Sequence, residues 1–181
     1  MEYSKEFKEA LSNFTSSEKD KLIFRLLKKD KILSQKLYFE LIDHETADEK
    51  RDQLEEKIGK RIEFANSILH DDKYFLSLIR NLSAEIVLHV KITTDKFGEV
   101  YLNLFLVKKV LEICNEKLKK IPNYVTYKLY IYLINKVYKA LSLLPKIDED
   151  FYLELREISE NLKILIEENY ELKKLFIKNR S

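Results

Sequence analysis

Three residues of this sequence could together bind a divalent metal ion: His44, His70 and Asp71. Neutral imidazoles and carboxylates are common ligands of such ions, and a bound ion can polarise a phosphoryl group and activate water. His44 stands 26 positions before the adjacent pair His70-Asp71. A further ligand could come from Asp95, Asp148 or Asp150. The pattern is therefore compatible with metal-dependent phosphoryl chemistry.

The segment around the pair, Ile68-Leu-His-Asp-Asp-Lys73, resembles the second metal motif of the histidine–aspartate (HD) family of metal-dependent phosphohydrolases. The resemblance covers about six residues. It implies an all-helical enzyme with His44, His70 and Asp71 as ligands of a divalent metal cofactor. The same residues also suit a helix end, because the C-terminal dipole favours a histidine and an aspartate can cap the next helix. We favour the helix end and keep the metal site as the alternative.

A second set of residues with binding chemistry is a group of tyrosines in the segment 122–144. Tyrosine rings can stack on the bases of single-stranded nucleic acid, and they are also common in protein interfaces and at core margins. The basic residues of this segment are three lysines with no arginine, so we favour the core or a protein interface. The predicted interaction surface consists of Tyr124, Tyr127, Tyr130, Tyr132 and Tyr138.

Composition argues against several other classes of protein. The net charge of +2 argues against broad electrostatic capture of nucleic acid or of an anionic membrane. Two glycines in 181 residues leave almost no scope for a phosphate-binding loop. The one cysteine, Cys114, cannot form an intrachain disulfide, and its apolar neighbours predict a buried thiol. Since neither a signal peptide nor a membrane span is apparent, we expect a cytoplasmic protein.

The elements that must position these residues are long helices. Two glycines and two prolines are too few for the frequent turns of a β-rich protein. The most apolar stretch, Val100–Val107, belongs to a predicted helix that starts near Gly98 and is apolar on nearly every side, so other helices must cover it. We therefore predict an all-α fold in which antiparallel helical hairpins form a multi-helix bundle or a short α-solenoid around this helix. No linker is apparent, and we predict a single domain over residues 1–181.

Local signals indicate where the helices begin and end. Thr15 with Glu18, and Thr46 with Glu49, have the spacing of capping boxes. Apolar residues recur every three or four positions between such signals. The expected helices cover about 2–14, 16–29, 30–42, 46–69, 72–93, 98–120, 122–144, 148–158 and 162–172.

Two places in the chain leave room for another interpretation. Ile86–Thr93 and Val100–Val107 are rich in β-branched and aromatic residues and could form a β-hairpin. The spacing of three and four continues beyond both segments, and it favours helices. Gly59 lies inside a predicted helix, where it costs about 1 kcal/mol relative to alanine. Close approach by a neighbouring helix would offset that cost.

No coherent catalytic set emerges from the sequence. The leading hypothesis is a non-enzymatic cytoplasmic helical protein that binds another protein or forms a homo-oligomer. One alternative is the HD-like phosphohydrolase with His44, His70 and Asp71. The other is a single-strand nucleic-acid binder that uses the tyrosines of the segment 122–144.

Overall fold

The computed structural model describes residues 3–68, 72–118 and 124–178. Within these ranges it contains α-helices and short 3-10 turns and no strand, which confirms the all-α prediction. The chain divides into two compact units, Met1–His44 and Glu45–Ser181. The prediction of a single domain over residues 1–181 concerns how these units join, and it stays a prediction.

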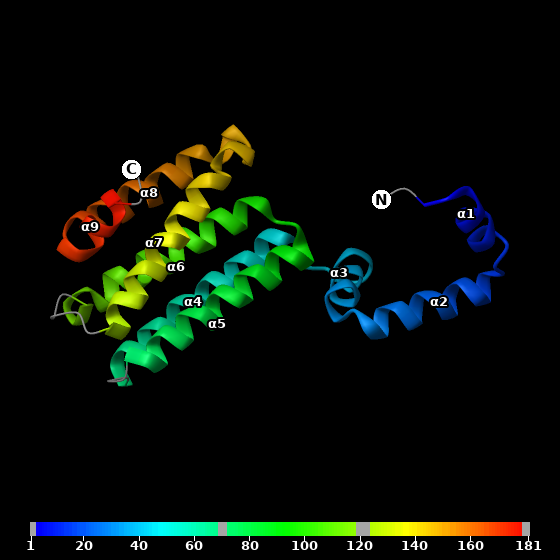
Figure 1. Ribbon diagram of the computed structural model, residues 1–181, viewed down its shortest axis with the longest axis horizontal. Coiled ribbons are helices and arrows are strands. Elements are labelled where there is room, and N and C mark those ends of the chain that lie inside the picture. Colours follow the sequence, from blue (N-terminus) through cyan, green and yellow to red (C-terminus); the bar gives the residue numbers. More distant parts are fainter. Residues whose placement is uncertain (1–2, 69–71, 119–123, 179–181) are drawn as a thin grey trace. The chain divides into compact units, whose positions relative to one another are not determined.

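The unit Met1–His44 contains three helices among its described residues (Figure 1). The capping box at Thr15 is confirmed: the Glu18 N–H donates to the Thr15 hydroxyl at 3.3 Å, and the Glu18 carboxylate accepts from the Thr15 N–H at 2.9 Å. None of the three helices contains a buried residue. They are α1 (Lys5–Ser12), α2 (Ser16–Lys29) and α3 (Lys31–Leu41).

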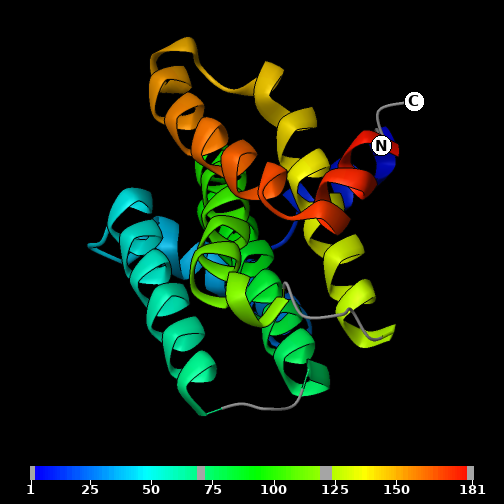
Figure 2. The ribbon, with the colours of Figure 1, turned by 90° about the vertical axis from the view of Figure 1, so that its left-hand side faces the viewer.

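The unit Glu45–Ser181 holds the hydrophobic core (Figure 2). Its first helix begins at the second predicted capping box, where the Thr46 N–H donates to the Glu49 carboxylate at 2.7 Å. The helices are α4 (Ala47–Ile68), α5 (Asp72–Thr93), α6 (Lys96–Leu118), α7 (Tyr124–Leu143), α8 (Tyr152–Glu167) and α9 (Tyr170–Lys178). Two 3-10 turns, η1 (Leu144–Lys146) and η2 (Glu149–Phe151), connect α7 to α8.

Helix α6 is the centre of this unit, as the sequence predicts. It packs against α4, α5, α7 and α8, and together these four helices cover it from several sides. Its buried residues are therefore not confined to one face; they include Phe97, Gly98, Val100, Leu102, Asn103, Leu104, Leu106, Val107, Val110 and Leu111. Among the described helices, none combines the length and the low charge that crossing a membrane requires.

One local prediction is wrong, and two other points are decided, of which the first confirms the helices favoured at Ile86–Thr93 and Val100–Val107. The β-hairpin alternative fails, because both of its segments lie in long helices, α5 and α6. The predicted break after Ile158 does not occur: α8 continues to Glu167, and Asn169 caps the next helix by accepting from the Leu172 N–H at 3.2 Å. Gly59 is buried, yet among the described residues no atom beyond its chain neighbours and the backbone of its own helix lies within 4 Å of the place where its Cβ would be.

Candidate functional site

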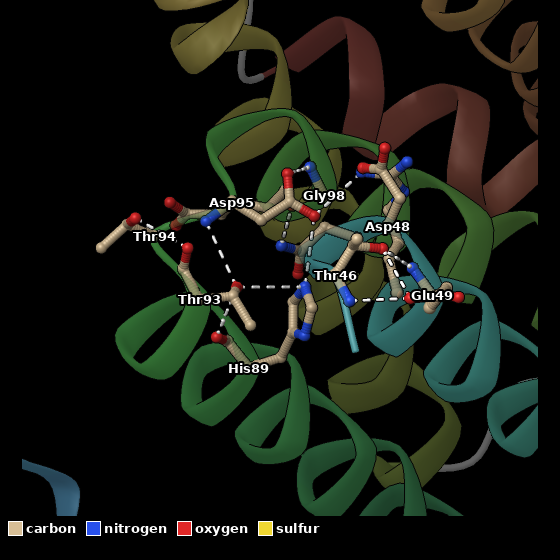
Figure 3. Close-up of polar contacts among 11 residues, drawn as sticks. Thr46, Asp48, Glu49, His89, Thr93, Thr94, Asp95 and Gly98 are labelled. Atoms are coloured by element: carbon tan, nitrogen blue, oxygen red, sulfur yellow. Dashed lines mark hydrogen bonds and ion pairs between the residues drawn. The ribbon is translucent and has the colours of Figure 1, made fainter. Parts of the chain in front are cut away.

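A connected group of polar contacts lies where α4, α5 and α6 meet (Figure 3). We call Arg51, His89, Asp95 and Gly98 the buried joint. Asp95 Oδ2 lies 3.0 Å from Arg51 Nη1 and 3.2 Å from His89 Nε2, and Asp95 Oδ1 accepts from the Gly98 N–H at 2.7 Å. The Asp95 and His89 side chains are 7% and 6% exposed. One carboxylate thus connects three helices.

The turn between α5 and α6 is shaped to place this carboxylate. Thr94 has φ of 59°, in the left-handed region, which is unusual for a β-branched residue. The Thr93 hydroxyl donates to the His89 carbonyl at 2.9 Å and accepts from the Asp95 N–H at 3.3 Å. These bonds hold the strained turn, and Asp95 in turn acts as the N-cap of α6.

The surroundings of Asp95 favour its ionised form. Burial alone would raise the pKa of Asp95, but the hydrogen bonds from His89 and from the Gly98 N–H, together with the Arg51 guanidinium, outweigh burial and lower it. Arg51 is held more firmly as a cation, because Asp95 and Asp48 raise its pKa against the effect of burial. The joint is therefore a largely buried ion pair whose carboxylate accepts hydrogen bonds from three residues.

The arrangement of Thr93, His89 and Asp95 is not that of an activated nucleophile. In a catalytic triad the hydroxyl and the carboxylate contact opposite nitrogens of the imidazole. Here Asp95 and the Thr93 hydroxyl, at 3.2 and 3.5 Å, both face Nε2. Thr93 is also buried and donates its proton to a backbone carbonyl. The geometry supports a structural role, which is to fix the angle between the helices.

A polar groove lies between α4 and α6. Its volume is about 440 Å³. Two basic side chains in its wall are already paired: Lys60 with Glu56 at 2.5 Å and Lys109 with Glu63 at 3.8 Å. We call it the α4–α6 groove, and its lining residues are Asp52, Glu55, Glu56, Gly59, Lys60, Glu63, Phe105 and Lys109.

Negative charge accumulates at one end of the α4–α6 groove. Burial raises the pKa of Glu55, and the neighbouring carboxylates of Asp52 and Glu154 raise it further, against the effect of a hydrogen bond from Tyr101. Burial and the charge of Glu55 also raise the pKa of Tyr101, so the phenol stays a donor. The ring of Tyr101 stacks between Phe97 and Phe105, with centroid distances of 5.5 and 6.2 Å. Carboxylates and aromatic faces together form a surface suited to organic cations.

A second polar feature is a half-buried lysine between α6 and α7. Lys136 donates to Asn103 Oδ1 at 2.9 Å, and the Asn103 amide donates to the Glu99 carbonyl at 2.5 Å. Burial, and then the positive charge of Lys139, lower the pKa of Lys136 to about 8, although Glu99 acts in the opposite direction. The folded state therefore destabilises the charged form of Lys136 relative to the unfolded chain, although the ammonium form still predominates below pH 8.

Substitution of Lys136 tests its lowered pKa through the pH dependence of stability. Because its folded pKa of about 8 lies below the ordinary 10.5, the cost of the charged form is complete below pH 8 and disappears as the pH rises towards 10.5. We expect the native chain to gain stability relative to Lys136→Met over that range, in urea unfolding at a series of pH values. Lys136→Arg stays charged throughout and should not show the gain. A difference between native and Lys136→Met that is independent of pH would contradict the prediction.

The predicted metal ligands are not brought together by any described contact. His44 precedes α4 in the chain and is exposed, and His70 and Asp71 lie outside the described residues. Helix α4, which separates His44 from His70 in the sequence, has 22 residues and is about 33 Å long. Across the described ranges, no three His, Cys, Asp or Glu side chains form a group that could hold a metal ion. The metal site at His44, His70 and Asp71 stays a prediction.

The five tyrosines of the predicted interaction surface do not share one surface, which corrects that prediction. Tyr130 is fully buried and pairs with the Asn169 amide at 3.3 Å, and the half-buried Tyr138 stacks on Phe176 and donates to its carbonyl. Tyr124 and Tyr127 are 73% and 41% exposed. Tyr132 is half-buried, with Arg80 5.8 Å and Lys136 5.7 Å from its ring centroid. Only Tyr124 and Tyr127 present an open surface.

The spacing of these tyrosines in the sequence already indicates that they lie on different sides of α7. Successive residues of a helix are rotated by about 100°, so Tyr130 lies about 240° around α7 from Tyr124. The role of Arg51 had no comparable signal, because its partner Asp95 lies 44 positions away in the sequence.

No protein-family model, curated protein or solved structure matches this chain. The geometry of the two units is therefore the basis for a functional proposal.

Proposed function

We propose that this chain is a non-enzymatic protein-interaction module that self-associates through its N-terminal unit, residues 3–44. The observation that carries the proposal is the lack of any buried residue in α1, α2 and α3. These helices have 8, 14 and 11 residues, and isolated helices below about 12–15 residues are marginal in water. A segment of this size needs a disulfide, a metal or association to be stable, and the single cysteine of the chain is in the other unit.

The apolar surface of this unit is large enough for a stable dimer. Eleven large apolar side chains of residues 3–44 are between 36% and 74% exposed, among them Phe24 at 64% and Leu41 at 74%. At about 150–250 Å² for a large side chain, the exposed part is on the order of 1,000 Å². A standard interface buries about 800 Å² on each partner.

The charge of the unit is compatible with a second copy as the partner. Residues 1–44 contain nine Lys or Arg and eight Asp or Glu, so two copies do not repel each other strongly. Two helical pairs, Lys5 with Glu9 and Lys36 with Glu40, already neutralise part of this charge at 3.8 and 3.7 Å. The remaining attraction between two copies is hydrophobic.

Sedimentation equilibrium of the full chain over a wide range of concentration tests the proposal. We expect a reversible dimer, and we expect Phe24→Ser to weaken it at least tenfold, since burying one such side chain is worth about 1.5–3 kcal/mol. Phe64→Ser in α4 is the matched control, because Phe64 is 65% exposed and lies in the other unit. A monomer at every concentration, or equal effects of the two substitutions, would contradict the proposal.

A further inference from the structure

A cleft lies between the C-terminal end of α7, the turn η1 that follows it, and the N-terminal part of α8. Its volume is about 680 Å³, within the range of roughly 300–1,000 Å³ that is usual for small-molecule sites. Most of its wall is aliphatic and consists of Leu141, Leu144, Pro145, Leu153 and Leu155. We call it the α7–α8 cleft.

The α7–α8 cleft reaches from the core of the unit to the solvent. Leu155 in its lining is 1% exposed and belongs to the hydrophobic core, whereas Leu153 is 81% exposed. Water therefore contacts a continuous aliphatic wall. Displacing that water with an apolar group is favourable, in proportion to the area covered.

The exposed apolar area of the cleft favours a small ligand over a second protein. Tyr152 and Leu153 are the most exposed large side chains of the lining, at 41% and 81%. At about 150–250 Å² for a large side chain, their exposed part is on the order of 250 Å². A standard protein interface buries about 800 Å² on each partner. A small ligand inside the cleft does not require an interface of that size.

The charge of the cleft favours a ligand with an anionic group. Among the described residues that line it, Arg156 is the one that carries a charge. Arg156 Nε donates to the Glu160 carboxylate at 2.8 Å, and this pair is exposed to solvent. The two terminal nitrogens of Arg156 have no partner in the described part of the chain. They can donate to both oxygens of a ligand carboxylate.

We propose that the α7–α8 cleft binds a fatty acid, with its acyl chain along the aliphatic wall and its carboxylate on the terminal nitrogens of Arg156. Burial of the chain provides most of the affinity, and the carboxylate fixes the orientation. Glu160 repels the ligand carboxylate, because both are negatively charged and share one guanidinium. Fatty-acid binding at this place goes beyond self-association through residues 3–44, and either can fail alone.

The test uses the full chain and undecanoic acid that carries a dansyl group at the end opposite the carboxylate. We expect saturable enhancement of dansyl fluorescence, and displacement by decanoic acid at lower concentration than by decanol. Leu153→Ser should weaken binding of the probe about tenfold, because it removes part of the aliphatic wall. Ile164→Ser is the matched control: Ile164 also lies on α8, is 56% exposed and does not line the cleft.

Charge variants test the contact with the carboxylate. Arg156→Gln should weaken the binding of decanoic acid about fivefold and leave that of decanol unchanged. Glu160→Gln should strengthen the binding of decanoic acid by a similar factor, and a misfolded variant would not produce such a gain. Lys163→Gln is the control for loss of a positive charge, since Lys163 is an exposed residue of α8 outside the cleft lining.

Three results would overturn the proposal: no binding of the probe by the native chain, equal effects of Leu153→Ser and Ile164→Ser, or equal displacement by decanoic acid and decanol. The titrations are repeated at several protein concentrations and in the Phe24→Ser background. The same affinity throughout shows that the cleft acts without self-association. An affinity that falls as the protein concentration rises would mean that a second copy occupies the cleft, and loss of binding in Phe24→Ser would mean that the probe binds between copies; both contradict the proposal.

Discussion

Replacement of Asp95 by alanine is expected to lower the free energy of unfolding of the unit Glu45–Ser181 by about 3 kcal/mol. The substitution removes the carboxylate that accepts from Arg51, His89 and the Gly98 N–H, and it leaves the Arg51 guanidinium, whose side chain is 13% exposed, without its buried partner. We expect the lower end of the usual range for a broken buried pair, because Arg51 keeps Asp48 at 2.8 Å. Urea unfolding followed by circular dichroism measures the change.

Asp95→Asn is the control that separates charge from shape. Its amide oxygen can still accept from the Gly98 N–H and cap α6, while the charge is lost, so we expect a smaller loss of stability. An Asp95→Ala variant as stable as the native chain would show that the joint does not hold these helices.

Lowering the pH should reduce the difference in unfolding free energy between the native chain and Asp95→Ala. The pKa of Asp95 in the folded state is below its ordinary value of 3.8. The contribution of its ionised form is therefore complete above that value, and it is lost as the pH falls through the lowered folded pKa. The unfolding free energies of the two chains should approach each other in that acidic range. A constant difference would show that the carboxylate acts through packing alone.

The second large effect is expected from Gly98→Ala, which should destabilise the same unit by about 1–3 kcal/mol. A Cβ at Gly98 would overlap the Asp95 carboxylate and would lie 3.2 Å from the Arg51 Cδ. The carboxylate cannot move away without losing its hydrogen bonds in the buried joint. The alanine would therefore displace the group on which α4, α5 and α6 converge. Thermal and urea unfolding should both report the loss.

Gly59→Ala is the matched substitution for this experiment. Both glycines lie in helices of the same unit, and alanine has the better helix propensity at both. Because the space beside Gly59 is open, Gly59→Ala should raise the free energy of unfolding by up to about 1 kcal/mol. Opposite signs at the two positions would confirm that contacts with Asp95 and Arg51, and not helix propensity, decide the effect at Gly98. Two stabilised variants would contradict this account.

Features that depend on neighbours in the chain could be predicted from the sequence. The capping boxes at Thr15 and Thr46 form as expected, because all their hydrogen bonds join residues three positions apart. The ion pair between Glu56 and Lys60 forms for the same reason. The central position of α6 also followed, since a helix with apolar residues on all sides requires cover from several others.

The break between α8 and α9 shows where local patterns become ambiguous. Apolar residues continue at a spacing of three and four from Leu155 through Tyr170, and no proline or glycine interrupts them. Both the predicted break after Ile158 and the observed end at Glu167 agree with that spacing. The choice depends on how α8 and α9 pack against α6 and α7, which no local signal contains.

The sequence by itself determined the helical class, most helix boundaries and the central helix, because these follow from hydrogen bonds and apolar periodicity within contiguous segments. Only the tertiary structure decided that Asp95 meets Arg51, that Gly59 faces open space and that Tyr130 is enclosed while Tyr124 is not. Each of these depends on which distant segment lies opposite a given helix face. Such pairings are set by the packing of the whole unit, and the amphipathic pattern of one helix does not identify its partner.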